Sequence, residues 1–144
     1  MNYSIYSILA AWLVAILPHW YAISIANSKH KFDNTNPRHA TQELEKRLTK
    51  EELETYKRAE AAQQNGFENL SFFACGVIAA NYAKVPVGTI NFLCFCYLIS
   101  RAIYNVLYIK TTTLQYSYFR TITFLTGIII CFTLFIKAGN AINQ

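Results

Sequence analysis

Acidic residues are missing from most of this 144-residue chain. All eight Asp and Glu residues, and eight of the thirteen Lys and Arg residues, fall between Lys29 and Glu68. The other basic residues are isolated inside or beside apolar runs, so no basic arm or stripe exists that could follow a phosphate backbone. The net charge of +5 therefore does not indicate a nucleic-acid partner.

Cysteine and histidine are few, and their spacing does not fit metal binding or a disulfide framework. The four cysteines all fall inside apolar runs, at Cys75, Cys94, Cys96 and Cys131. The three histidines share no ligand spacing with one another or with the cysteines, at His19, His30 and His39. We therefore expect the cysteines to act as small apolar side chains, and we expect no metal site.

Apolar residues make up 53% of the chain and aromatic residues 15%, which is more than a water-exposed surface tolerates. Residues 5–26 carry no charge and would form a helix of about 33 Å, long enough to span a bilayer. The residues before this run include no Lys or Arg, and Pro18 interrupts it, so it is a poor candidate for a cleaved signal peptide. We expect it to be retained as the first span.

The second apolar run is short, and a polar stretch of high helical propensity leads into it. We expect one long helix that begins outside the membrane near Lys50, spans it over residues 66–83 and ends before Pro86. The polar residues that this helix carries into the bilayer must face protein or water.

Two further spans are predicted at residues 86–109 and 119–137. The result is an all-α integral membrane protein with a single four-helix domain over residues 1–144, in which short connections make neighbouring helices antiparallel. The loop at 27–58 holds most of the Lys and Arg residues, so the positive-inside rule places it in the cytosol and both termini in the lumen.

Polar side chains gather near the cytosolic end of the predicted spans. Arg58, Asn65 and Glu68 recur at helical spacing on the second helix, and Arg101 lies about 12 Å inside the third, where a charge costs several kcal/mol unless it is paired or hydrated. One interpretation is a buried Arg101 to Glu68 pair that fixes helix packing. The other, which also accounts for the surrounding amide and phenols, is a site for a small ligand with carboxylates.

Three short motifs resemble one known family in order and in membrane depth. They are the Arg-…-Asn-x-x-Glu block within residues 57–74, the pattern Arg101-x-x-Tyr104-x-x-x-Tyr108, and Arg120-Thr121 at the start of the fourth helix. Together with the helix order they resemble the membrane-associated proteins in eicosanoid and glutathione metabolism (MAPEG). The resemblance covers nearly the whole chain.

The resemblance implies a homotrimer that binds glutathione between neighbouring subunits near the cytosolic face, with an apolar co-substrate entering from the membrane lipid. It implies that Arg120 stabilises the thiolate, with Thr121 as a possible hydroxyl donor. The other implied glutathione-binding residues are Arg58, Gln63, Asn65, Glu68, Arg101, Tyr104 and Tyr108. It also favours the endoplasmic reticulum or the mitochondrial outer membrane.

The leading hypothesis is therefore a membrane-bound glutathione transferase or peroxidase that acts on apolar electrophiles or lipid hydroperoxides. The chain departs from the family pattern at Ala61, where the eicosanoid-synthesising branch has an arginine, and in a longer connection before the fourth helix. The Ala61 departure favours a second hypothesis, a non-catalytic member of the same fold that binds lipid or a protein partner. A small transporter is the third, since ion pathways also use charges inside the membrane.

Overall fold

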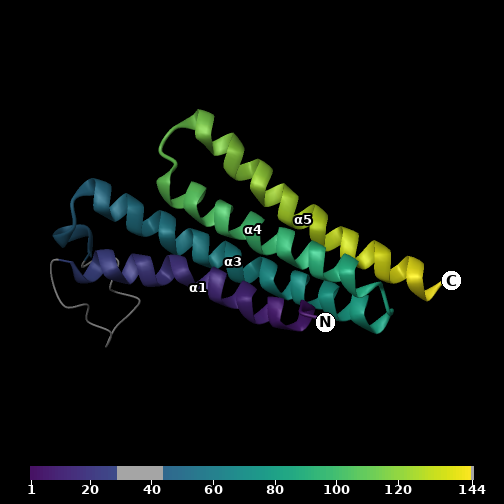
Figure 1. Cartoon of the computed structure of the whole chain (residues 1–144). Helices are drawn as coiled ribbons and strands as arrows, with labels where there is room; N and C mark the ends of the chain where they lie inside the picture. The colour runs from purple at the N-terminus through teal and green to yellow at the C-terminus, as the bar shows by residue number, and fades with distance from the viewer. Residues whose placement is uncertain (29–43, 144) are drawn as a thin grey trace.

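The computed structural model of the chain describes residues 1–28 and 44–143, apart from the side chains of residues 115 and 116. This part folds into four long helices: α1 (Ser4–Asn27), α3 (Lys50–Tyr82), α4 (Val87–Lys110) and α5 (Leu114–Ile142). Figure 1 shows both termini at one end of the bundle. Helices α3 and α4 contact each other, and each also contacts both α1 and α5. Residues 29–43 of the predicted cytosolic loop, which include His30 and His39, lie outside the described residues.

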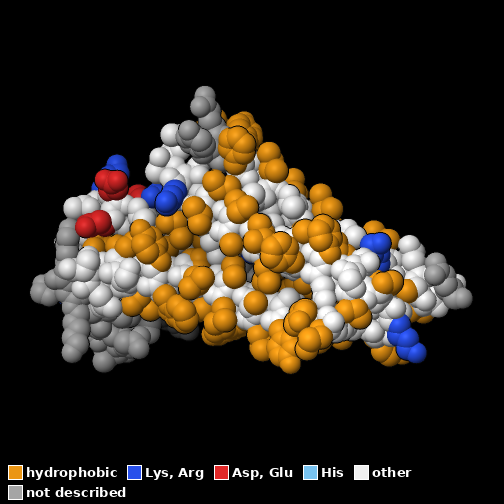
Figure 2. All heavy atoms as spheres, viewed as in Figure 1, with side chains coloured by type: hydrophobic (Ala, Val, Ile, Leu, Met, Phe, Trp, Pro, Cys, Tyr) orange, Lys and Arg blue, Asp and Glu red, His pale blue; other side chains and the backbone are white. Residues whose placement is uncertain are grey.

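Three helical segments are long and apolar enough to cross a membrane, judged by length and composition: Ser4–Asn27, Val87–Lys110 and Ser117–Ile142. Large apolar side chains point outward along them; Phe95 is 63% exposed and Ile129 62%. In Figure 2 apolar side chains cover the middle of the visible face, whereas Lys and Arg side chains lie near its ends. The chain is therefore an integral membrane protein whose apolar surface suits contact with lipid.

Helix α3 is continuous over 33 residues although its first half is polar. Thr49 begins it with a capping box, in which its side chain accepts from the Glu52 backbone N–H and the Glu52 carboxylate accepts from the Thr49 N–H. The helix ends at Tyr82, and Lys84 follows in the left-handed region at φ 57° before Pro86 opens α4. The sequence predicts this start and this end because both depend on local signals.

Helix α5 is longer than the span predicted at 119–137. It begins at Leu114 and continues to Ile142, five residues beyond Lys137. The prediction ended at this lysine because its charge closes the apolar run. Lys137 is exposed on the helix surface, where its ammonium group stays solvated without breaking the backbone hydrogen bonds.

Small residues let α1 and α3 approach closely. A Cβ atom built on Gly66 of α3 would lie 3.0 Å from Ala15 Cβ and 3.1 Å from Ala15 Cα of α1. Close approach over Gly and Ala is how membrane helices gain packing energy when lipid surrounds them. Gly66 therefore fixes which side of α3 faces α1, and with it the direction of every other side chain on α3.

A hydrogen bond from α4 compensates for the proline inside α1. Pro18 has no N–H, so the carbonyl of Val14 loses its partner in the helix. Asn105 Nδ2 donates to this carbonyl at 2.8 Å, and Asn105 itself is only 9% exposed. A buried amide of α4 thus satisfies the backbone of α1 and ties the two helices together.

Two asparagines tie the N-terminus to the end of the bundle that lies away from the predicted site. Asn81 Nδ2 donates to Ser4 Oγ at 2.8 Å, and Asn91 Oδ1 accepts from the Tyr3 N–H at 3.0 Å. Polar groups toward the predicted lumenal side therefore hold the chain terminus, which gives no support to a polar path across the membrane.

Candidate functional site

Arg101 is buried between α3, α4 and α5, with 4% of its surface exposed. Nη1 lies 3.4 Å from Asn65 Oδ1 and Nη2 lies 3.4 Å from the Phe124 carbonyl, both at the long limit for hydrogen bonds. Nε is buried without a hydrogen-bond partner among the described residues. In the same part of the chain, no Asp or Glu forms an ion pair with this guanidinium group. Arg101 is therefore a buried cation whose charge is only weakly compensated by its neighbours.

Arg101 begins a continuous stack that we call the arginine–tyrosine ladder, formed by Arg101, Tyr104, Tyr108 and Arg120. The Arg101 guanidinium carbon lies 4.7 Å from the centre of the Tyr104 ring, and the Tyr104 and Tyr108 ring centres are 5.5 Å apart. The Arg120 guanidinium carbon lies 4.5 Å from the centre of the Tyr108 ring. Cation–π contacts at these distances favour both cations and link α4 to the start of α5.

Gly127 of α5 makes room for the Arg101 side chain. A Cβ atom at this position would lie 3.0 Å from Arg101 Nη2 and 3.2 Å from Nε. The absence of a side chain there lets the guanidinium group lie flat between α4 and α5. This role of Gly127 was not predicted, because it depends on the packing of two helices.

Glu68 does not pair with Arg101, so the packing interpretation of these two residues is wrong. Glu68 is exposed, and its carboxylate accepts from Gln64 Nε2 at 3.1 Å. At 100° per residue Glu68 lies about 60° farther around α3 than Asn65, which is enough to turn it away from α4 while Asn65 reaches Arg101. The predicted stripe on α3 is therefore divided between two directions.

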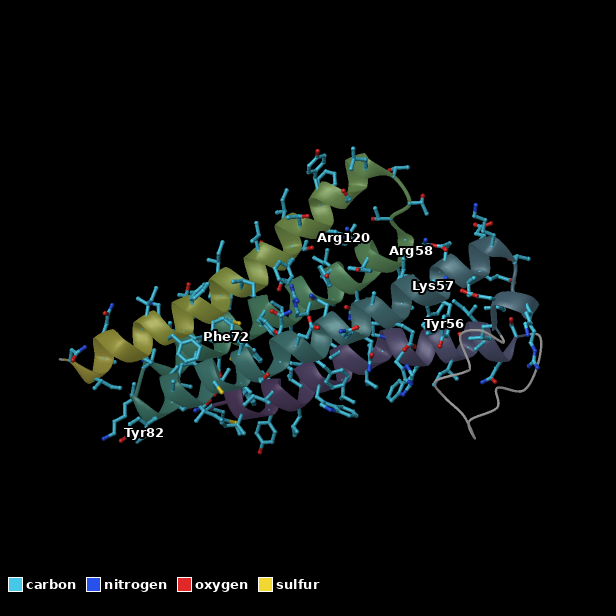
Figure 3. The ribbon with its side chains drawn as sticks, turned by 180° about the vertical axis from the view of Figure 1, so that it is seen from behind. Tyr56, Lys57, Arg58, Phe72, Tyr82 and Arg120 are labelled. Atoms are coloured by element: carbon cyan, nitrogen blue, oxygen red, sulfur yellow. The ribbon has the colours of Figure 1, made fainter. Side chains whose placement is uncertain are left out.

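Arg58 binds the carboxyl end of α4. Its Nε donates to the Ile109 carbonyl at 2.9 Å, and its Nη2 donates to Thr55 Oγ1 at 2.9 Å. A cation at the carboxyl end of a helix satisfies a free carbonyl and interacts favourably with the helix dipole. Figure 3 shows Arg58 and Arg120 at the same end of the bundle, near the connection between α4 and α5.

A wide groove runs along the outer face of α3, with a volume of about 750 Å³. We call it the α3 groove. Its lining residues all come from α3: Tyr56, Lys57, Glu60, Ala61, Gln63, Gln64, Phe67 and Glu68. Gln63 and Glu68 are thus the predicted site residues that line this groove, which one helix forms and which is open to its surroundings.

A hydrogen-bonded pair that sequence reasoning missed lies at the edge of this groove. His19 Nδ1 of α1 lies 2.7 Å from Glu60 Oε1 of α3. Burial, followed by the negative charge of Glu60, raises the pKa of the Tyr56 phenol above its usual value, so this phenol remains a hydrogen-bond donor at neutral pH. The sequence does not predict this contact, because His19 lies in an apolar run and Glu60 in a separate helix of high propensity.

Thr121 is exposed, and its hydroxyl donates to the Ser117 carbonyl at 3.3 Å, within its own helix. The predicted residues therefore lie in two places. Asn65 and the arginine–tyrosine ladder lie between α3, α4 and α5, whereas Gln63 and Glu68 lie in the α3 groove. All four cysteines are free thiols, and within residues 1–28 and 44–143 no group of three metal-ligating side chains lies together.

The bundle, with its apolar outer surface and its buried arginine, defines an integral membrane protein with a polar site inside helical packing. The chain belongs to the MAPEG family, whose model matches residues 5–140. The family resemblance inferred from the three motifs is thereby confirmed. No curated protein and no solved structure matches the chain.

Proposed function

We propose that this protein is a membrane-bound glutathione transferase or peroxidase. The observation that carries the proposal is the arginine–tyrosine ladder, in which two guanidinium groups are joined through two tyrosine rings and have no ion-pair partner among the described residues. A cationic cluster in a medium of low dielectric favours an anionic ligand. Membership of the MAPEG family supports the same conclusion.

Thiolate activation follows from the position of Arg120. A free thiol has a pKa of about 8.5, so it is mostly protonated at neutral pH, and the thiolate is the nucleophile. Arg120 is half-buried at the outer end of the ladder, where Tyr108 holds its guanidinium group. We assign Arg120 to lowering the thiol pKa of bound glutathione. The thiolate sulfur then forms a bond to an electrophilic carbon while the leaving group departs with the bonding electrons.

The division of the site favours an assembly of several subunits. The α3 groove is lined by residues of α3 alone, whereas α4 and the start of α5 form the ladder, and Glu68 forms no ion pair with Arg101 or Arg120 in the described part of the chain. Polar groups of α3 at membrane level need protein or water against them, because lipid offers no hydrogen bonds. We propose a homotrimer in which the ladder of one subunit faces the α3 groove of the next, with glutathione between them.

Four spans and a defined orientation complete the proposal. The second half of α3 packs against the three apolar helices, so we assign residues 66–83 as the fourth span. The basic loop and the site then lie on the cytosolic side with the termini in the lumen, in the endoplasmic reticulum or the mitochondrial outer membrane.

Glutathione titration of the detergent-purified protein tests this function. The thiolate is followed by its ultraviolet absorbance, and turnover is measured with an apolar aryl halide. Arg120→Ala is expected to abolish the thiolate signal and to lower turnover by about 10²- to 10³-fold, with a smaller change in glutathione affinity. Lys137→Ala removes an exposed cation from the same helix and serves as the control. An Arg120→Ala protein with wild-type turnover would contradict the assignment.

A second candidate is a non-catalytic MAPEG-fold protein that binds lipid or a protein partner. Ala61 favours it, because this residue lines the α3 groove with a methyl group where an arginine would hold a ligand carboxylate. This candidate predicts a folded wild-type protein that does not bind glutathione at millimolar concentration.

A further inference from the structure

A small cavity lies between α1, α3 and α4, along the side of α4 that carries Arg101. Its volume is about 10 Å³, which is close to the space that one water molecule needs. The residues that line it from α1 and α3 bear short or apolar side chains: Ala11, Val14, Ala15 and Gly66. Those that line it from α4 are Tyr97, Arg101 and Asn105. All the polar side chains in the wall of this cavity therefore come from α4.

The three polar residues recur every four positions, so they share one face of α4. They are buried, with exposed fractions of 2% for Tyr97, 4% for Arg101 and 9% for Asn105. Arg101 Nε has no hydrogen-bond partner among the described residues. Asn105 Nδ2 donates to the Val14 carbonyl, but no described residue donates to Asn105 Oδ1. The Tyr97 hydroxyl lies 3.5 Å from the Asn69 carbonyl, at the long limit for a hydrogen bond. Three side chains with incompletely used polar groups thus line one cavity.

The polar wall decides whether this cavity holds water. Apolar cavities stay dry, whereas a cavity with about two to four hydrogen-bonding groups binds water. The unused groups suit a water molecule, because the Arg101 side chain only donates and Asn105 Oδ1 only accepts. We propose that one buried water molecule binds here, where it accepts from Arg101 and donates to Asn105, with the Tyr97 hydroxyl as its third partner. Without it, polar groups would be buried without hydrogen bonds, which is unfavourable inside a bundle surrounded by lipid.

This water site connects the proline in α1 to the buried arginine in α4. Asn105 satisfies the carbonyl that Pro18 leaves without a donor, and its other end binds the water that Arg101 also binds. Arg101 is then hydrated inside the bundle, which favours a cation that has no acidic partner among the described residues. The inference does not depend on glutathione, because the water serves Arg101 in either candidate function.

Radiolytic footprinting of the full-length, detergent-purified protein tests for this water. X-ray pulses generate hydroxyl radicals from water, so a buried ring is oxidised only where a water molecule lies beside it. Tyr97 and Phe73 form a matched pair, because both rings are at most 2% exposed and they stack with centres 3.8 Å apart, but only Tyr97 lines the cavity. Relative to the rates of the two rings in the unfolded protein, Tyr97 is expected to be oxidised several-fold faster than Phe73. Equal rates would overturn the proposal.

Ala11→Val gives a second arm, because its two additional methyl groups occupy the space of the water. The oxidation of Tyr97 is expected to fall to the rate of Phe73, and the midpoint of detergent unfolding is expected to fall as the hydrogen bonds of the water are lost. Ala102→Val makes the same change at an exposed position of α4 and should alter neither quantity.

A dry cavity predicts a different pair of results. Tyr97 and Phe73 would then be oxidised equally in the wild type, and Ala11→Val would raise the unfolding midpoint, because apolar groups would fill a void. Oxidation of Tyr97 that Ala11→Val leaves unchanged would also overturn the proposal, since the water would then lie elsewhere. If Ala11→Val does not fold, the comparison of Tyr97 with Phe73 in the wild type decides the question alone.

Discussion

The hydrogen bond between α4 and the proline-interrupted α1 gives the sharpest prediction about the fold. Asn105 Nδ2 donates to the Val14 carbonyl at 2.8 Å because Pro18 cannot. Asn105→Leu keeps a side chain that branches at the same carbon, although a larger one, and leaves this carbonyl without a partner in the bundle. The expected result is a loss of stability in the wild-type background and a much smaller loss in a Pro18→Ala background.

The magnitude follows from two bounds. An unsatisfied buried polar group costs about 1–3 kcal/mol, whereas interhelical hydrogen bonds measured in a membrane protein average about 0.6 kcal/mol with a maximum near 1.7 kcal/mol. We expect Asn105→Leu to cost about 1–1.5 kcal/mol. In Pro18→Ala the new N–H donates to Val14, so the same substitution should cost less than about 0.5 kcal/mol. The coupling energy between positions 18 and 105 is then about 1 kcal/mol.

The assay is reversible unfolding in mixed micelles with a rising fraction of denaturing detergent, followed by circular dichroism, for all four proteins of the cycle. The cycle is its own control, because any effect of Pro18→Ala alone cancels. An equal cost of Asn105→Leu in both backgrounds would refute the reasoning, since it would show that Asn105 does not act by replacing the missing N–H.

Two further predictions concern the site. Arg101→Leu should leave the unfolding transition unchanged or raise its midpoint, because no carboxylate among the described residues depends on this cation. The same substitution should lower glutathione affinity at least tenfold. A large loss of stability in Arg101→Leu would contradict the first expectation. In the proposed trimer, Glu68→Gln and Arg120→Ala subunits should each be inactive alone and should regain part of the activity when co-expressed, because some interfaces then combine an intact groove with an intact ladder. Turnover that remains at the sum of the two single variants would contradict a shared site.

Local signals explain the parts of the fold that the sequence predicts. Apolar runs locate α1, α4 and α5, and the capping box with strong helix formers extends α3 back to Lys50. Helix α5 continues beyond the predicted span because a lysine closes an apolar run but does not end a helix. The hydrogen bond of Asn105 depends on tertiary packing, although Pro18 alone indicates that the Val14 carbonyl needs some other donor.

Helical periodicity predicts some of the contacts in the site but not all of them. Arg101, Tyr104 and Tyr108 were placed together correctly, because residues at this spacing on one helix share a face. The same argument failed for Glu68, since periodicity does not decide which part of a broad stripe faces the neighbouring helix. That rotation is set by the contact of Gly66 with Ala15, which brings α3 and α1 together and leaves Glu68 on the outside.

The division between groove and ladder also decides what kind of ligand the proposed site requires. Glu68 and Lys57 offer opposite charges along α3, and Arg120 at the start of α5 offers a cation held by Tyr108. A peptide held by the groove alone would leave its thiol without a cation, and a thiol held by the ladder alone would have no carboxylate to receive the peptide's amino group. In the proposed trimer, a ligand that satisfies both lies between two copies of the chain. The proposed function therefore predicts that thiolate formation depends on assembly of the subunits.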